Sequence, residues 1–209
     1  MAEARSILTS DGVALEAELA APTDAPIRAA MVLCHPHPQY GGTMRSIVVS
    51  ALFDALPRAG VACLRFNFRG VEGSAGSHGE GLSEPEDVRA ALEEALTFAL
   101  DGAVAVVGWS FGADMALSVA DSRIDGWVAI APPLRFGNAF AAVAEDPRPK
   151  HLVLAQHDDF RDPSDVQREV ASWKNVTTEV VPGASHFFTG RTDRVVDATV
   201  AFLATLSRG

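Results

Sequence analysis

Short apolar runs alternate with more polar, helix-forming stretches along most of the chain. Runs of five to seven residues that are mostly apolar or β-branched indicate strands, and the continuously apolar ones indicate strands buried on both faces. These runs are Arg28 to Cys34, Val61 to Phe66, Ala103 to Val107, Gly126 to Ala131, His151 to Ala155 and Val176 to Val181. The stretches with helix-forming composition are Met44 to Leu56, Ser83 or Glu84 to Leu100, Ala113 to Ala120, Pro163 to Trp173 and Thr192 to Leu206. The alternation predicts an α/β fold: a mostly parallel, twisted sheet with helices on both faces, in a single domain over residues 1–209.

The beginning of the chain has a different pattern. Two runs with strand character, Ser6 to Thr9 and Val13 to Ala20, flank the dipeptide Asp11-Gly12. An Asp-Gly pair between two such runs is a strong signal for a tight hairpin turn. We therefore expect two antiparallel strands at the start of the sheet.

The segment with the clearest chemical signature is Gly108-Trp109-Ser110-Phe111-Gly112, a Gly-x-Ser-x-Gly pentapeptide. It lies between a predicted buried strand and a predicted helix, which is the context this motif needs to form a nucleophile turn. A sharp turn there would strain the backbone of Ser110, and a Cβ at either flanking glycine would collide with a neighbouring element. The structural alternative is a serine that merely caps the following helix.

Polar residues also follow three other predicted strands. These are the segment His35 to Gly42, the pair Asp158-Asp159, and His186. In a parallel sheet the carboxyl ends of the strands meet at one edge, where ligands bind. A serine hydroxyl needs a base that takes its proton and an acid that orients the base, so these strand ends hold the residue types for nucleophilic catalysis.

Composition and charge exclude several classes of function. The 209 residues carry a formal net charge of −10, which argues against nucleic acid or an anionic membrane as a partner. No apolar run reaches the roughly 18 residues that span a bilayer, and no basic segment with an apolar core opens the chain, so a cytoplasmic protein is expected. Cys34 and Cys63 lie in predicted strands and are expected to be buried free thiols. We expect a monomer or a homodimer.

Two motifs connect the chain to a known family. His35-Pro36-His37-Pro38-Gln39-Tyr40-Gly41-Gly42 follows one predicted strand, and Arg65-Phe66-Asn67-Phe68-Arg69-Gly70 closes the next. With these motifs and the order serine, aspartate, histidine, the sequence resembles the α/β-hydrolase superfamily. Within it the chain is similar to a small capless bacterial group that carries both motifs and is dienelactone-hydrolase-like or esterase-like. The resemblance extends from about Ala29 to Leu203 and implies the α/β-hydrolase fold and an esterase-like activity.

The resemblance also implies roles for three residues. Ser110 is the expected nucleophile, and His186 is the expected base because the superfamily places it after a strand near the C-terminus. The family pattern Gly-x-x-Asp followed by proline fits Asp159, which has Pro163 four positions later; Gln156 stands where the pattern has glycine. We therefore predict Asp159 as the orienting acid and keep the adjacent Asp158 as the alternative.

An oxyanion hole requires two N–H donors. One is expected to be the backbone amide of Phe111, which directly follows the nucleophile. Pro36 and Pro38 have no N–H, so the backbone amide of His37 is the expected second donor, with the Tyr40 hydroxyl as the alternative. The substrate pocket is expected to include Tyr40, Trp109 and Phe187, although Trp109 is equally suited to simple packing.

No cofactor and no metal is expected. His35 and His37 lack the spacing and the companion ligands of known metal motifs. Hydrogen bonding of His35 to backbone groups within its loop is the simpler explanation for this histidine. Arg65 and Arg69 are expected to brace neighbouring loops through carboxylates.

The length of the segment between the predicted strands that end near Ala131 and begin near His151 indicates how open the substrate site is. Only Pro132 to Lys150 separates them, where many relatives carry a large helical cap. With a minimal cap or none, the site is expected to be open and to take small carboxylic esters or thioesters. The alternatives are a dienelactone-hydrolase-like or peptidase-like hydrolase, and a catalytically idle fold used for binding.

Overall fold

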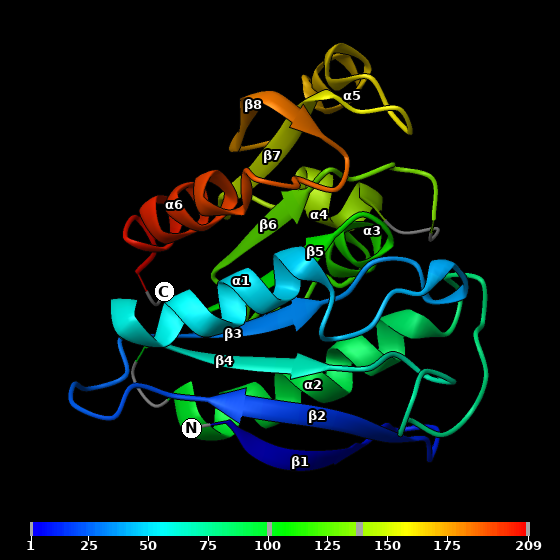
Figure 1. The fold of residues 1–209 in the computed structure, drawn as a ribbon, viewed down its shortest axis with the longest axis vertical. Coiled ribbons are helices and arrows are strands. Elements are labelled where there is room, and N and C mark those ends of the chain that lie inside the picture. Colours follow the sequence, from blue (N-terminus) through cyan, green and yellow to red (C-terminus); the bar gives the residue numbers. More distant parts are fainter. Residues whose placement is uncertain (1, 100–101, 137–139, 208–209) are drawn as a thin grey trace.

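The computed structural model describes residues 2–99, 102–136 and 140–207 of the chain. Eight strands form one sheet in the order β1-β2-β4-β3-β5-β6-β7-β8 (Figure 1). The strands are β1 (Glu3–Leu8), β2 (Ala14–Ala20), β3 (Ala29–Cys34), β4 (Val61–Phe66), β5 (Ala103–Trp109), β6 (Gly126–Ile130), β7 (Lys150–His157) and β8 (Val176–Ser185). β1 and β2 form the predicted hairpin, and β2 pairs antiparallel with β4, whereas β4, β3 and β5 to β8 are parallel.

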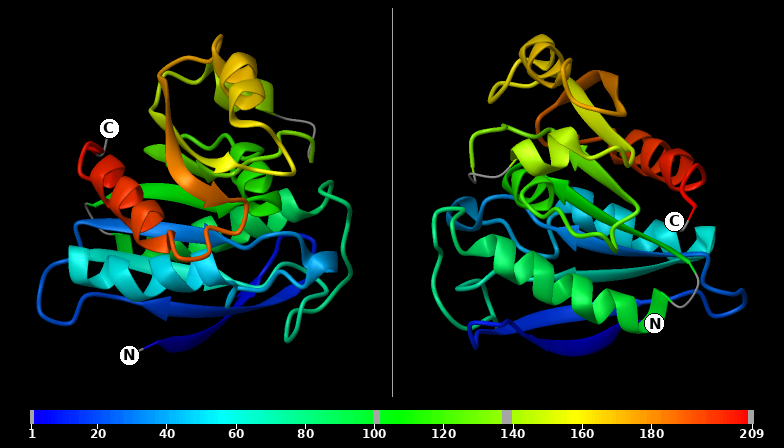
Figure 2. Two further views of the ribbon diagram at one scale, coloured as in Figure 1. Left: turned by 45° about the horizontal axis from the view of Figure 1, so that its top comes forward. Right: turned by 180° about the vertical axis from the view of Figure 1, so that it is seen from behind.

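Helices cover both faces of the sheet, as the alternation predicted (Figures 1 and 2). One face carries α1 and α6, and the other carries α2, α3, α4 and α5. The bounds are α1 (Ile47–Ala55), α2 (Glu84–Ala99), α3 (Phe111–Leu117), α4 (Phe140–Glu145), α5 (Pro163–Val170) and α6 (Thr192–Leu203), with short 3-10 turns at η1 (Pro38–Tyr40) and η2 (Leu56–Ala59). The predicted mostly parallel α/β fold is therefore confirmed.

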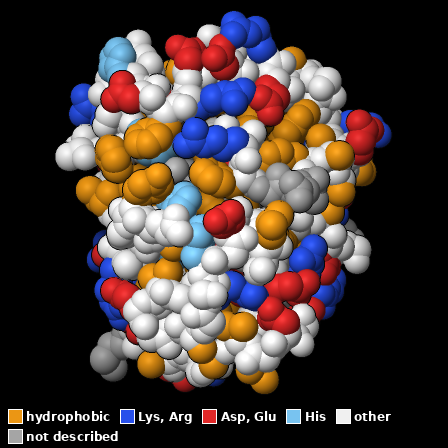
Figure 3. Space-filling model, turned by 90° about the vertical axis from the view of Figure 1, so that its right-hand side faces the viewer, with side chains coloured by type: hydrophobic (Ala, Val, Ile, Leu, Met, Phe, Trp, Pro, Cys, Tyr) orange, Lys and Arg blue, Asp and Glu red, His pale blue; other side chains and the backbone are white. Residues whose placement is uncertain are grey.

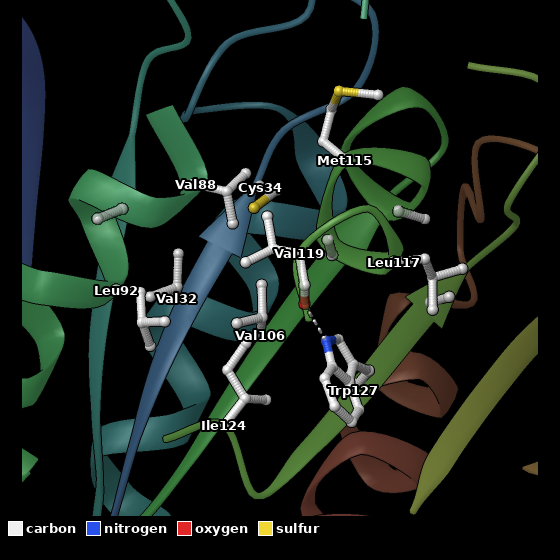
Figure 4. Close-up of a cluster of buried hydrophobic side chains, with 14 of the residues drawn as sticks. Val32, Cys34, Val88, Leu92, Val106, Met115, Leu117, Val119, Ile124 and Trp127 are labelled. Atoms are coloured by element: carbon white, nitrogen blue, oxygen red, sulfur yellow. Dashed lines mark hydrogen bonds between the residues drawn. The ribbon is translucent and has the colours of Figure 1, made fainter. Parts of the chain in front are cut away.

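The central strands are buried on both sides because their side chains alternate between two cores. Val32 and Val106 enter the core under α2 and α3, whereas Met31 and Val107 enter the core under α1 and α6. Figure 4 shows the first of these cores, where Trp127 lies among aliphatic side chains and donates its indole N–H to the carbonyl of Val119 at 3.1 Å. Satisfying this N–H allows the largest side chain of the core to be fully buried.

Element ends differ from the predictions mainly near the C-terminus. β7 runs on to His157 and β8 to Ser185, beyond the predicted ends at Ala155 and Val181, and a register irregularity between Ala155 and His157 accompanies the extension. Further corrections are that α1 begins at Ile47 with Ser46 as its N-cap, α5 ends at Val170 and α6 ends at Leu203. The predicted end of α2 at Leu100 lies outside the described residues.

The segment between β6 and β7 contains the single short helix α4, so the described part of the fold has no helical cap over the strand ends. Cys34 and Cys63 are buried and free, as predicted, and burial raises the pKa of both thiols. Across the described residues, no helix is both long enough and apolar enough to cross a membrane.

Candidate active site

The turn between β5 and α3 holds Ser110 in a strained backbone conformation, with φ of 55° and ψ of −122°. Glycine on each side permits the turn. A Cβ on Gly108 would lie 2.0 Å from the carbonyl oxygen of Gly112, and a Cβ on Gly112 would lie 2.3 Å from that of Cys34. The predicted collisions with the helix and the neighbouring strand are thus both present. The N–H of Ser110 bonds to Ile130 at 2.8 Å and ties the turn to β6.

The side chains of Ser110, His186 and an aspartate form a hydrogen-bonded row at the carboxyl edge of the sheet. His186 Nε2 lies 2.9 Å from Ser110 Oγ, and His186 Nδ1 lies 2.8 and 3.0 Å from the two carboxylate oxygens of Asp158. The carboxylate only accepts, so Nδ1 carries the proton and Nε2 is left to accept from the serine hydroxyl. Both the imidazole and the carboxylate are almost entirely buried.

The expected acid, Asp159, is wrong as a partner of His186: the structure places Asp158 there and leaves Asp159 exposed. Because β7 continues to His157, Asp158 directly follows the strand and turns toward β8. Backbone N–H groups of Phe160 and Arg161 also bond to its carboxylate, at 2.9 and 3.2 Å, and fix it in place. The family pattern Gly-x-x-Asp pointed to Asp159. It was misleading because this chain has Gln156 in place of the glycine, and β7 continues past that position to His157.

Trp109 and two phenylalanines surround the imidazole. The indole N–H of Trp109 donates to the backbone carbonyl of His186 at 3.1 Å, so Trp109 both packs and lines the pocket. The ring of Phe160 lies 4.4 Å from that of His186, and the ring of Phe187 lies 5.6 Å from it. Phe160 was not among the predicted pocket residues, because its loop position carries no periodic or motif signal.

Two backbone N–H groups near Ser110 are free of protein acceptors among the described residues: those of Phe111 and His37. Phe111 is the first residue of α3, where a helix leaves its N–H groups unpaired. His37 precedes η1, and its ring packs 5.0 Å from the ring of Phe111. Burial lowers the pKa of the His37 imidazole, whose Nδ1 accepts a bond from the N–H of Gln39. The Tyr40 side chain, the alternative donor, is largely exposed.

His35 is a buried brace between two loops. Its Nδ1 lies 2.7 Å from the carbonyl oxygen of Pro36, and its Nε2 accepts the N–H of Phe68 at 3.0 Å. One nitrogen donates and the other accepts, so the ring is neutral; burial lowers its pKa to about 4. His35 thereby fixes the segment that carries His37, in agreement with the predicted backbone pairing.

Other buried polar groups hold the loops around the site. Asn67 accepts from Met44 and donates to Glu16 and Glu72, which anchors the segment that leads into α1. Asp114 accepts the N–H groups of three consecutive residues after β6 at 2.9 Å each, and burial raises its pKa although these donors oppose the shift.

Both arginines pair with carboxylates, as predicted, but only Arg69 braces a loop. Arg65 pairs with Glu18, and Arg69 pairs with the buried Asp87 and with Asp11. Hydrogen bonding from Arg69 lowers the pKa of Asp11 to about 2. Arg65 therefore braces the paired strands β2 and β4, whereas Arg69 joins its loop to α2 and to the turn between β1 and β2.

A cavity of about 580 Å³ opens beside Ser110 and His186. The predicted residues Tyr40, Trp109 and Phe187 all line it. Lining residues that were not predicted are Pro36, Gly41, Gly42, Ser46, Ile47 and Phe160. In the described portion of the chain, no group of three or more His, Cys, Asp and Glu side chains is arranged to hold a metal ion.

Comparison with known proteins places the chain in a family. No family model matches it. An uncharacterised protein of Rickettsia prowazekii is 32% identical over 194 residues, which cover 88% of this chain and 80% of that protein.

Solved structures give the family its name. The structure of an α/β serine hydrolase homologue from Coxiella burnetii is similar over 96% of this chain and 97% of its own, with 32% identity and a TM-score of 0.87. A lidless α/β serine hydrolase from Xanthomonas campestris is similar over 97% of this chain and 93% of its own, with 27% identity and a TM-score of 0.85. The chain belongs to the α/β serine hydrolase family.

The buried His35 predicts a stability change with pH. Its folded pKa of about 4 lies below the unfolded value of 6.5, so on acidification the unfolded chain binds a proton before the folded chain does. Stability is therefore lost as the pH falls. Between pH 7 and pH 5 this residue should lower the free energy of unfolding by about 2 kcal/mol. Because other buried groups such as Asp114 also titrate in this range, urea denaturation at both pH values should find that the wild type loses about 2 kcal/mol more than His35→Gln.

The exposed His157 provides the matched control for this measurement. His157→Gln should keep the wild-type loss of stability. Equal losses in the wild type and in His35→Gln would contradict the neutral, buried state of His35.

Proposed function

We propose that the protein is a serine esterase that hydrolyses small carboxylic esters or thioesters through an acyl-enzyme on Ser110. The observation that carries the proposal is the row of contacts from Ser110 Oγ to His186 Nε2 at 2.9 Å and from His186 Nδ1 to Asp158 at 2.8 Å. These are hydrogen-bond distances for a nucleophile, its base and the group that orients the base. Asp158 takes the role that the sequence analysis gave to Asp159.

Acylation involves Ser110, His186 and two backbone N–H groups. His186 accepts the proton of the Ser110 hydroxyl as its oxygen attacks the ester carbonyl. The N–H groups of Phe111 and His37 stabilise the negative oxygen of the tetrahedral intermediate. The imidazolium then returns the proton to the leaving alcohol or thiol as the bond from carbon to the leaving group breaks.

Deacylation repeats the sequence with water as the nucleophile. His186 takes a proton from water, the hydroxide adds to the acyl carbon, and Ser110 leaves with the proton that His186 returns. The products are a carboxylic acid and an alcohol or thiol. Asp158 remains ionised and holds the imidazole in the tautomer that both half-reactions need.

The cavity supports small substrates. Its volume of about 580 Å³ lies within the range of small-molecule sites, and its lining is largely apolar with Ser110 and His186 at one side. No cap covers it in the described part of the chain, and the similar structure from Xanthomonas campestris is likewise without a lid. A long acyl chain would therefore extend into solvent.

Replacing the nucleophile tests the proposal directly. Ser110→Ala removes the attacking oxygen, so kcat on p-nitrophenyl acetate should fall at least about 10³-fold while the circular dichroism spectrum is unchanged. The assay should be run beside a small thioester, a lactone and an amide. A fluorophosphonate probe should label the folded wild type and not the variant. A folded wild type that stays unlabelled would support the idle, binding-only alternative.

The adjacent aspartates form a matched pair of variants. Asp158→Asn should lower kcat about 10²- to 10⁴-fold, because an amide donates as well as accepts and no longer holds His186 in the required tautomer. Asp159→Asn should stay within about twofold of the wild type, since this side chain is exposed. Initial rates on p-nitrophenyl acetate measure both. A larger loss in Asp159→Asn would reverse the assignment.

The open cavity predicts a limit to useful acyl length. Each CH₂ that becomes buried adds about 0.8 kcal/mol to binding. In a series of p-nitrophenyl esters, kcat/KM should therefore rise over the first few carbons and then level off once the chain leaves the cavity. A continued rise beyond about ten carbons would contradict the small-ester proposal.

A further inference from the structure

Aromatic side chains line the cavity on the side of His186. Trp109, Phe160 and Phe187 line it together with the imidazole. The rings of Phe160 and Phe187 lie 6.2 Å apart at 83°, and that of Phe187 lies 6.3 Å from Trp109 at 82°, so both pairs meet edge to face.

These two phenylalanines are also unusually exposed. Phe160 is 49% exposed and Phe187 is 52% exposed, although each packs against the buried His186. Figure 3 looks onto the end of the molecule where the parallel strands terminate, and hydrophobic side chains gather there beside histidine side chains. Both rings line the cavity and retain exposed surface that a ligand can contact.

The rest of the lining comes from the segment that carries His37 and Tyr40 and from the first residue of α1, Ile47. Because the oxyanion must point at the N–H groups of His37 and Phe111, the carbonyl oxygen of an ester faces this part of the lining. The leaving oxygen must approach His186 Nε2 to receive its proton. The group attached to that oxygen consequently lies along the aromatic side chains.

We propose that Phe160 and Phe187 form a subsite for an aromatic leaving group, so that the favoured substrates are esters of aryl or arylmethyl alcohols. This inference rests on the proposed esterase function. When the C–O bond of the tetrahedral intermediate breaks, His186 Nε2–H gives its proton to the departing oxygen. The aromatic alcohol then leaves between the two rings, and no further reactant is required.

The backbone of both subsite residues is attached to Asp158 and His186. The backbone N–H of Phe160 donates to Asp158 Oδ1 at 2.9 Å, the carboxylate that also binds His186. Phe187 directly follows His186, whose carbonyl is bonded to Trp109. The two rings therefore have a fixed position relative to the imidazole, as a leaving-group site requires.

The charges nearby favour a neutral leaving group. Arg161 is the cation that follows Phe160, and its guanidinium pairs with Glu169 and bonds to the carbonyl of Pro133. Both of its terminal nitrogens thus have partners, although its Nε has none among the described residues, and the exposed rings offer an apolar, planar surface. An aromatic ring matches this surface better than an anionic or a strongly hydrated group.

The experiment compares three esters on the wild type, Phe160→Ala and Phe187→Ala. Methyl acetate is the reference, benzyl acetate carries the ring on the alcohol side, and methyl phenylacetate carries it on the acyl side. Methanol and benzyl alcohol have similar acidity, so they are leaving groups of similar intrinsic quality. A difference in kcat/KM between the two acetates therefore reports contacts of the benzyl ring with the protein. Each variant should lower the ratio of kcat/KM for benzyl acetate over methyl acetate about three- to tenfold. The ratio for methyl phenylacetate over methyl acetate should change less than twofold.

Leu82→Ala is the matched control, since Leu82 is an exposed hydrophobic side chain outside the cavity, and it should leave both ratios unchanged. Methyl acetate alone reports any disturbance of His186 by the truncations. If the two ratios fall equally, or neither falls, the leaving-group subsite is overturned while the esterase function stands. If the wild type hydrolyses none of the three esters, the proposed function fails and the subsite fails with it.

Discussion

The close approach of three backbone segments around Ser110 is the constraint on which the site depends. The glycine at the start of α3 lies against the carbonyl oxygens that end β3, and the glycine that precedes the nucleophile lies against α3. No side chain fits in either gap, so the helix sits directly on the strand ends. As a result the free N–H groups of Phe111 and His37 come from segments that are already in contact.

Buried polar side chains then fix the loops that leave the sheet. His35 joins the ends of β3 and β4, Asp114 gathers the segment after β6, and Arg69 locks the segment after β4 to α2 through Asp87. Each group is buried and each has partners, so their desolvation is offset by hydrogen bonds or ion pairs. The cavity is consequently bounded by irregular segments whose shape is determined by the core.

The sequence was sufficient for the architecture and for part of the site. Apolar runs with β-branched residues predicted the sheet, because burial on both faces leaves a local compositional signature. The strand-turn-helix context of Ser110 and the position of His186 after a strand predicted that they would meet, and they do. Asp159 was predicted as the partner of His186, whereas the structure has Asp158 there. The choice between these adjacent residues depends on where β7 ends, which the sequence does not indicate. Phe160 was missed since its role arises from packing across loops, which no local pattern encodes.

The bond from the Trp109 indole to the carbonyl of His186 has a dynamic consequence. Trp109 immediately precedes Ser110, so this bond links Ser110 and His186 although they are far apart in the chain. The bond restrains the backbone of His186 relative to the side chain of Trp109, because separating β8 from β5 here would break a buried hydrogen bond. The same link restrains the spacing between Ser110 Oγ and His186 Nε2.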